Sequence, residues 1–138
     1  EFGPRALGNR SLLADPRDSN IKDAINDIKR RQKFRPFAPA ILEEYATEYF
    51  DGPMNEYMQF VAKAKHDYSS VTHVDGTARV QVVKKGCGSA IRQILEEWYE
   101  STGCPMLLNT SLNIKGKPMV NTKEDAEEFS RLYNVAVF

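Results

Sequence analysis

The sequence predicts an α/β fold, a twisted mixed β-sheet flanked by about four helices. Three patterns support this class. Apolar runs at residues 37–42 and 105–109 end in polar segments, which is typical of buried strands. Apolar residues recur at helical spacing in residues 21–28 and 91–98. Side chains alternate over residues 78–83, as in a half-buried strand. With 138 residues and 41% hydrophobic side chains, the chain is expected to form one domain, residues 1–138, around its own core.

Composition narrows the possible functions. The 19 basic and 19 acidic residues balance, so a general attraction to nucleic acid is not supported. No run is long enough to span a membrane, and no signal peptide is visible. Cys87 and Cys104 are too far apart for a metal knuckle and suggest no disulfide framework, so we expect a cytoplasmic protein. The chain begins without methionine inside a Gly-Pro-Arg motif, and we therefore expect it to be excised from a longer protein.

The first seventeen residues are expected to form a loop, a short strand or turn at 12–14, and a second loop closed by Asp15-Pro16. This segment contains Arg5, Arg10 and Arg17. Guanidinium groups near glycines can hold a phosphate or carboxylate through forked hydrogen bonds. They can equally contact a neighbouring domain, and for part of this set we favour the neighbouring domain.

A helix is expected from a cap at Asp18 or Ser19 to about Arg31, because Pro36 and Pro39 prevent its continuation. Five cations lie at or beyond its end: Lys29, Arg30, Arg31, Lys33 and Arg35. Cations suit the C-terminal end of a helix dipole. Their concentration in a chain of zero net charge nevertheless favours an anion site.

The middle of the chain is expected to alternate strands with one short helix. We expect strands at 37–42, 57–64 and 78–83, a helix at 43–50, a turn at 51–53 and a polar loop at 65–70. In the last of these strands, Arg79 and Gln81 are expected to share one face.

The C-terminal third carries clear helix signals. Ser89 and Gly103 are placed to cap the two ends of a helix. Thr122 and Asp125 have the spacing of a capping box, which predicts a second helix to Leu132. A last short strand is expected at 135–138.

The segment after the apolar run at 106–108 is the strongest candidate for a binding loop. A buried strand there delivers Asn109, Thr110, Ser111 and Asn113 to its exit. Ligands of open α/β sheets bind at such strand ends. The alternative is a turn rich in Asn and Ser that hydrogen-bonds only itself.

Several familiar sites are excluded by sequence. There is no phosphate-binding P-loop motif, no dinucleotide-binding glycine motif and no nucleophile elbow. His73 and Asp75 are weak metal-ligand candidates, and a polar loop without metal is preferred. The remaining cationic and small polar residues suit chemistry on phosphates, where positioning and charge neutralisation dominate. They are Lys29, Arg31, Arg79, Asn109, Ser111 and Asn113.

Five motifs, in order along nearly the whole chain, carry a family resemblance. They are Gly-Pro-Arg-Ala-Leu-Gly-Asn-Arg-Ser (3–11), Asp-Pro-Arg (15–17), Phe-Arg-Pro-Phe-Ala-Pro (34–39), His-Val-Asp-Gly-Thr-Ala-Arg-Val-Gln (73–81) and Leu-Asn-Thr-Ser-Leu-Asn-Ile-Lys-Gly (108–116). This set closely resembles the C-terminal domain of the NodU/CmcH-type O-carbamoyltransferases, which implies a YrdC-like fold.

The resemblance implies that this domain takes carbamoyl phosphate and ATP, with magnesium, and makes carbamoyl-adenylate. A Kae1-like N-terminal domain of the same full-length chain, which holds iron, would then transfer the carbamoyl group to a hydroxyl. No metal is expected on the present residues. The implied catalytic residues are Lys29, Arg31, Ser111 and Asn113, and the implied nucleotide-binding residues are Arg79, Asn109 and Thr110. Leu112 and Lys117 depart from the family, which usually has phenylalanine and an acidic residue there.

Two other functions remain open from sequence. YrdC-like folds can present a basic concave surface to double-stranded RNA, although zero net charge and the lack of interleaved aromatic residues argue against this use. The chain could also be a non-catalytic interface domain for the rest of a longer protein.

Overall fold

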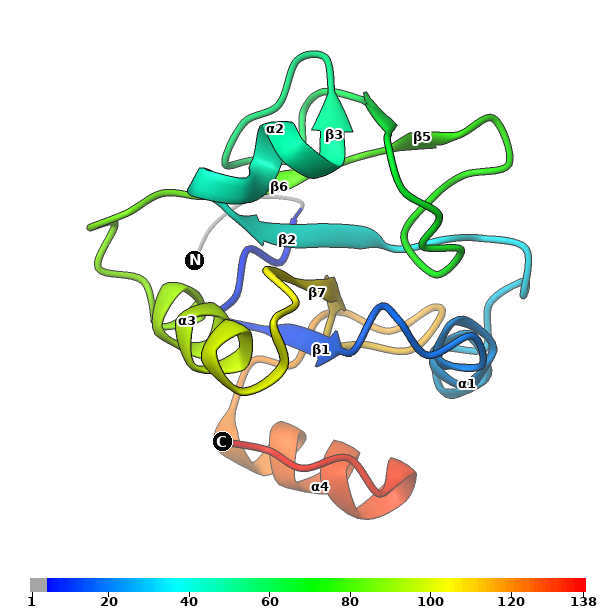
Figure 1. The fold of residues 1–138 in the computed structure, drawn as a ribbon. Coiled ribbons are helices and arrows are strands. Elements are labelled where there is room, and N and C mark those ends of the chain that lie inside the picture. Colours follow the sequence, from blue (N-terminus) through cyan, green and yellow to red (C-terminus); the bar gives the residue numbers. More distant parts are fainter. Residues whose placement is uncertain (1–4) are drawn as a thin grey trace.

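The computed structural model describes residues 5–138 (Figure 1). It has seven strands: β1 (Ser11–Ala14), β2 (Ala38–Leu42), β3 (Phe50–Asp51), β4 (Ala62–Ala64), β5 (Thr77–Ala78), β6 (Gln81–Val83) and β7 (Met106–Ser111). The helices are α1 (Ile21–Ile28), a 3₁₀ turn η1 (Glu43–Tyr45), α2 (Ala46–Tyr49), α3 (Ala90–Thr102) and α4 (Lys123–Tyr133). The predicted class, a mixed sheet flanked by helices, is confirmed.

The larger sheet has the strand order β1-β7-β2-β6. β7 runs antiparallel to both of its neighbours, while β2 and β6 are parallel. All five residues of β2 are buried, because the strand is central and both faces of the sheet are covered. On one face, α3 packs Ile91 and Leu95 against Ala40 and Leu107. The apolar runs that predicted β2 and β7 therefore form the centre of the fold.

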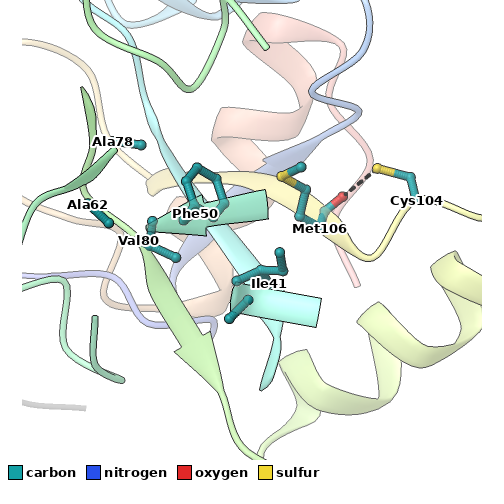
Figure 2. Packing of buried hydrophobic residues seen from close by; sticks show 8 residues of the cluster. Ile41, Phe50, Ala62, Ala78, Val80, Cys104 and Met106 are labelled. Atoms are coloured by element: carbon teal, nitrogen blue, oxygen red, sulfur yellow. Dashed lines mark hydrogen bonds between the residues drawn. The ribbon is translucent and has the colours of Figure 1, made fainter. Parts of the chain in front are cut away.

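The opposite face of the larger sheet is covered in two parts. In the first part, α1 and α4 contribute Ile25 and Phe129 to a cluster around Leu12 and Leu108. The other part is the small antiparallel sheet β3-β4-β5. Figure 2 shows how Phe50, Ala62, Ala78 and Val80 gather around Ile41 and Met106 of the larger sheet.

The expected strand at 78–83 is divided between the two sheets. β5 ends at Ala78, β6 begins at Gln81, and Arg79 and Val80 bridge them. Gln81 is buried, with 4% of its surface exposed, so the alternation that placed it on one face with Arg79 breaks at this point. The prediction of one continuous strand was wrong, because each half finds its partner in a different sheet.

Two other strand predictions also differ from the structure. The expected strand at 57–64 is reduced to β4, since the Asn55 side chain accepts hydrogen bonds from the backbone N–H groups of Tyr57 (3.0 Å) and Gln59 (3.2 Å). Such a side-chain turn competes with strand pairing. No strand forms at 135–138, where the chain leaves α4 through the left-handed residue Asn134 (φ 53°).

Helix boundaries follow their caps. Ser89 and Gly103 (φ 69°) flank α3, and the Thr122–Asp125 capping box begins α4, as predicted. α1 is shorter than expected at both ends, with Asn20 as its N-cap and Lys29 as its C-cap. Arg31 therefore lies outside the helix.

The reason for this early end is a reversal of the chain. Arg30 adopts φ 52°, and the Arg31 N–H bonds back to the carbonyl of Asn26 (2.8 Å). The buried Asn26 amide also donates to the carbonyls of Lys33 (3.4 Å) and Arg35 (3.0 Å). These bonds fold the cation-rich segment back along α1.

Candidate functional site

Lys29 lies at the C-terminal end of α1 and is almost fully buried, with 2% of its surface exposed. Its ammonium group donates to the carbonyl oxygen of Ser111 and to the carbonyl and side-chain oxygens of Asn113, both 2.9 Å away. An ammonium has three donors, so these oxygens use all of them. Burial, and then the charge of Arg31, lowers the pKa of Lys29 to about 8. With these three hydrogen bonds, Lys29 anchors the loop that follows β7.

That loop is ordered by its own polar side chains as well. The Ser111 hydroxyl donates to the Asn113 side-chain oxygen (2.6 Å), and the Asn113 amide donates to the Lys117 carbonyl (3.0 Å). The Lys115 N–H bonds to the carbonyl of Lys29 (2.9 Å), which closes the loop against α1. The self-bonded turn considered from sequence is thus part of the structure, but Ser111 and Asn113 remain only half-buried at the surface.

Arginines surround a neighbouring hollow of about 360 Å³, between the segment after α1 and the turn before β5. Its lining residues are Arg31, Phe34, Arg35, Pro36, Phe37, Ala38, His73, Val74 and Arg79. No carboxylate lines it, and no carboxylate in residues 5–138 forms an ion pair with Arg31, Arg35 or Arg79. We call this cavity, with its three arginines, the arginine hollow.

The arginine hollow is electrostatically costly without a ligand. Burial and then Arg35 lower the pKa of Arg31, and burial followed by the charges of Arg5 and Arg31 lowers the pKa of Arg79. The Nε of Arg79 is buried without a hydrogen-bond partner. Arg31 is partly compensated because its guanidinium lies 5.4 Å from the centre of the Phe37 ring. A bound anion would relieve both the repulsion and the unsatisfied donor.

Asn109 lies deeper than sequence reasoning suggested, with 2% of its surface exposed. Its amide donates to the Gln81 side-chain oxygen (2.7 Å) and to the carbonyl of Ala6 (3.1 Å), while its own side-chain oxygen is buried and unpaired. Its ladder partner Ala38 lines the arginine hollow. The next residue, Thr110, pairs with Leu12 in the ladder and projects from the other face of the sheet.

The structure therefore groups the predicted residues into two adjoining sets. Lys29, Ser111 and Asn113 contact one another directly, and Arg31 and Arg79 share the arginine hollow. Asn109 and Thr110 do not line that hollow. The sequence placed Arg35 in the five-cation run expected to bind an anion, but not among the named site residues, and it considered His73 only as a weak metal ligand. The two phenylalanines that line the hollow, Phe34 and Phe37, were not assigned to the site, although they belong to the Phe-Arg-Pro-Phe-Ala-Pro motif.

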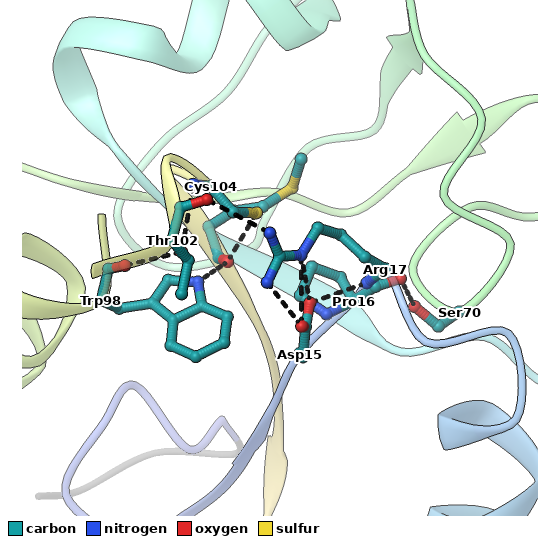
Figure 3. Close-up of polar contacts among 8 residues, drawn as sticks. Asp15, Pro16, Arg17, Ser70, Trp98, Thr102 and Cys104 are labelled. Atoms are coloured by element: carbon teal, nitrogen blue, oxygen red, sulfur yellow. Dashed lines mark hydrogen bonds and ion pairs between the residues drawn. The ribbon is translucent and has the colours of Figure 1, made fainter. Parts of the chain in front are cut away.

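Arg17 has a different role from the ligand or neighbour contact considered from sequence. Figure 3 shows its guanidinium between Asp15 and the end of α3. It forms a forked ion pair with Asp15 (2.7 and 2.9 Å), donates to the carbonyl of Thr102 (3.3 Å) and lies 5.4 Å from the Trp98 ring. The hydrogen bond with Asp15 raises the pKa of Arg17 and lowers that of Asp15. Gly3 and Pro4 of the first motif lie outside the described residues.

Other candidate sites carry less chemistry. The Asp75 carboxylate accepts from the N–H (2.9 Å) and hydroxyl (2.6 Å) of Thr77 and so forms a turn. Across residues 5–138, no three His, Cys, Asp or Glu side chains are grouped as metal ligands would be. A larger groove of about 930 Å³ lies along α3, lined by four glutamates, by Lys85 and by Arg92, which is already paired with Glu44 and Glu96, so the groove has excess negative charge. No helix in the described chain has the length and apolar character to cross a membrane.

Comparison with known proteins gives the family. Residues 1–137 match the family described as carbamoyltransferase C-terminus. The chain is 47% identical over 135 residues to the nodulation protein NolNO of Sinorhizobium fredii and 45% identical over 135 residues to NolO of Bradyrhizobium diazoefficiens. It is also 37% identical over 140 residues to nodulation protein U of Rhizobium tropici.

These alignments cover most of this chain and a small part of each relative. They span 91% of the chain for NolNO and NolO and 98% for nodulation protein U, but 20%, 25% and 24% of the respective relatives. The chain thus spans about a quarter or less of the length of these relatives. The resemblance noted in the motifs is confirmed, and the chain belongs to the carbamoyltransferase family, whose C-terminal region it matches.

Proposed function

We propose that this chain binds ATP and carbamoyl phosphate and forms carbamoyl-adenylate, which another part of a longer protein then uses to carbamoylate a hydroxyl. The observation that carries this proposal is the arginine hollow, whose arginines meet no carboxylate among residues 5–138. The loop of Ser111 and Asn113 is joined to it through Lys29, which lies close enough to Arg31 for that charge to lower its pKa. The family assignment supports carbamoyl transfer as the overall chemistry.

The reaction balances with one water. The phosphoryl group of carbamoyl phosphate passes to water and leaves as inorganic phosphate. A carbamate oxygen then attacks the α-phosphorus of ATP, and the bond to pyrophosphate breaks. Both substrates and both leaving groups are polyanions, so the chain's main tasks are to neutralise charge and to align the reacting oxygen with phosphorus.

Arg31, Arg35 and Arg79 suit the first task. Guanidinium groups bind phosphate oxygens through two parallel hydrogen bonds, and these three have no competing carboxylate among residues 5–138. A magnesium ion would accompany ATP and be held mainly by its phosphates, as is common at nucleotide sites. The ion would neutralise part of the triphosphate charge. The arginines would bind those phosphate groups that reach the hollow.

Ser111 and Asn113 suit the second task as hydrogen-bond donors to phosphate or carbamoyl oxygens. We propose hydrogen-bond donation and not covalent attack by Ser111, because its hydroxyl donates to Asn113. The Lys29 ammonium lies 3.3 Å from this hydroxyl, but its donors are taken up by the Ser111 carbonyl and by two oxygens of Asn113. Lys29 contributes a positive charge beside this loop and fixes its shape. Asn109 and Thr110, which the resemblance assigns to the nucleotide site, precede Ser111 in β7; Asn109 is buried on one face of the sheet and Thr110 lies on the other.

The direct test is adenylate formation by the purified chain. We expect labelled carbamoyl phosphate and ATP together to give carbamoyl-adenylate and pyrophosphate, and to give neither product when one substrate is omitted. No labelled hydroxyl acceptor should appear unless the rest of a full-length relative is added. Labelling of an acceptor when this chain is the only protein added would contradict this division of labour.

Titration calorimetry separates the competing functions. ATP and duplex RNA are each titrated at two salt concentrations, because binding to RNA through phosphates weakens steeply with salt. ATP binding with no RNA binding supports the enzyme, whereas the reverse result would make the chain an RNA-binding module. If neither binds and carbamoyl phosphate is not consumed, the chain is an interface domain.

A further inference from the structure

We propose that Gln81 is a positioning residue of the adenylation site, acting through Asn109 and the backbone of residues 6–7 to hold Arg5 beside Arg79. This inference rests on the proposed function, since it concerns the same phosphate-binding arginines. It adds a residue that lines neither the arginine hollow nor the loop after β7.

The contacts of Gln81 join three distant parts of the sequence. Its amide donates to the carbonyl of Leu7 (2.9 Å), and its side-chain oxygen accepts from the Asn109 amide (2.7 Å). The Asn109 amide donates in turn to the carbonyl of Ala6 (3.1 Å). Gln81 and Asn109 are 4% and 2% exposed, so water does not compete for these bonds. Two buried amides thus fix two consecutive carbonyls of the N-terminal segment.

The surroundings of this amide pair are apolar. Gln81 pairs with Ala40 in the ladder, and the same face of the sheet carries Leu107 and Val83 against α3. An aliphatic residue would pack in such a position, but it could not donate to a backbone carbonyl. The side-chain amides of Gln81 and Asn109 donate to the backbone carbonyls of residues 6–7, which in a larger sheet would be paired with the N–H groups of a neighbouring strand.

Gly8 secures the same segment by a second means. It adopts φ 124°, and a side chain there would place its Cβ 2.7 Å from the Cβ of Ile91 in α3. The Gly8 N–H also donates to the Ser11 hydroxyl (3.1 Å). The segment before β1 can therefore lie directly against α3 only with glycine at this position.

The residue held by this arrangement is Arg5. It is exposed and directly precedes the two carbonyls that Gln81 and Asn109 hold, while Arg79 lies two residues before Gln81 on the other side of the same bonds. The charge of Arg5 accordingly is one of the causes that lower the pKa of Arg79. Two like charges separate unless the backbone holds them together or an anion lies between them. The buried amides supply the first condition, which prepares Arg5 and Arg79 for a shared phosphate.

The test compares Gln81→Met with the matched control Gln59→Met. Gln59 forms an amide pair of the same length with Asn55 (2.7 Å), but it is exposed. In calorimetry, we expect Gln81→Met to weaken ATP binding about tenfold, as for loss of one well-placed phosphate contact, and Gln59→Met to leave it within twofold. Thermal unfolding identifies any variant that is not folded.

A double-mutant cycle separates positioning from a general structural effect. In an Arg5→Ala background, Gln81→Met should change ATP affinity less than twofold, because the residue it positions is gone. Gly8→Ala displaces the same segment without touching either amide, and it should show the same dependence on Arg5. An equal loss in both backgrounds would overturn the inference while leaving ATP binding, and thus the proposed function, in place.

Hydrogen exchange tests the positioning independently of ATP. The backbone N–H groups of residues 6–11 should exchange faster in Gln81→Met than in the parent chain, with no comparable change for Gln59→Met. Unchanged exchange would contradict the positioning role even in a chain that binds ATP. If the parent chain does not bind ATP, the proposed function fails, and the role of Gln81 in that site fails with it.

Discussion

On the α3 side of the larger sheet, the Arg92 guanidinium is buried and donates to Glu96 (2.7 Å), to Glu44 (2.5 and 2.8 Å) and to the carbonyl of Val83 (3.1 Å). In the arginine hollow, Arg79 meets no carboxylate of the described chain, and its Nε lacks a partner. One region satisfies its arginine with the chain's own acceptors, while the other leaves donors for something else.

The two environments shift pKa values in opposite directions. The hydrogen bond to Glu44 raises the pKa of Arg92 further, and the same bond lowers the pKa of Glu44 to about 2. Burial and like charges instead lower the pKa of Arg31 and Arg79. The contrast shows that the partner of an arginine indicates its role. An arginine paired with carboxylates stabilises the fold, whereas a buried arginine without a carboxylate destabilises it until an anion binds.

The largest expected effect is on the rate of adenylate formation, and it is tested by removing one serine hydroxyl from each region. Ser111→Ala should slow adenylate formation by roughly 10²–10³-fold without abolishing it, because one donor to a developing charge is lost. Ser101 provides the matched control, since its hydroxyl donates to the Glu97 carbonyl on α3, away from the arginine hollow. Ser101→Ala should leave the rate unchanged. Mass-spectrometric detection of a carbamoylated Ser111 would show instead that this serine is a nucleophile.

Arg79→Met tests the unpaired arginine. Loss of a charge-assisted phosphate contact should cost about 1.5–3 kcal/mol of binding, and calorimetry should detect the weaker affinity for ATP. Thermal stability should stay equal or rise, because a buried cation without a carboxylate partner is removed. A folded variant with unchanged ATP affinity would remove Arg79 from the site.

Arg92→Met should have the opposite profile. Removing this guanidinium breaks its contacts with both carboxylates, and we expect the free energy of unfolding to fall by about 1–3 kcal/mol. The value is below that of a fully buried pair because the Glu44 and Glu96 side chains are 41% and 47% exposed. Urea unfolding measures this change, and ATP affinity serves as the control. A variant of full stability with weakened ATP binding would reverse the comparison.

The smallest effect is the pH dependence of the paired region. Glu44 has a pKa of about 2 in the folded chain against an ordinary value of 4.5. Its stabilising contribution is therefore present above pH 4.5 and is lost as the pH falls towards 2. The stability difference between the parent chain and Arg92→Met should shrink over that range in urea unfolding. A difference that stays constant would mean that the Arg92–Glu44 contact contributes little.

Much of the fold and family could be predicted from sequence because the signals are local. Ser89, Gly103 and the Thr122–Asp125 box act within one helical turn, and they placed the ends of α3 and α4. The apolar runs of β2 and β7 marked the buried centre of the sheet. The motifs identified the family, and they contain Arg35, Arg79 and the Ser-x-Asn pair of the candidate site, whereas Arg31 came from the cation run after the first helix.

Local signals failed where a distant partner chose the conformation. Residues 78–83 read as one strand, but hydrogen bonding to β4 on one side and β2 on the other divides them. The expected helix through Arg31 ends early because the Asn26 side chain bonds to carbonyls seven and nine residues later. Each competing bond is invisible to periodicity, which considers only neighbours on one element.

The roles of individual polar residues were decided only by tertiary structure. Lys29 was expected to take part in an anion site at the end of its helix, but in the structure it is buried and donates to Ser111, 82 residues away. From sequence, Arg17 was open to binding an anion or contacting a neighbouring domain, but in the structure it bonds to Thr102, 85 residues away, and to Asp15. Sequence determines which side chains can bind an anion. The fold decides which of them keep a free donor, because each buried polar group must first be satisfied by whatever the packing brings near it.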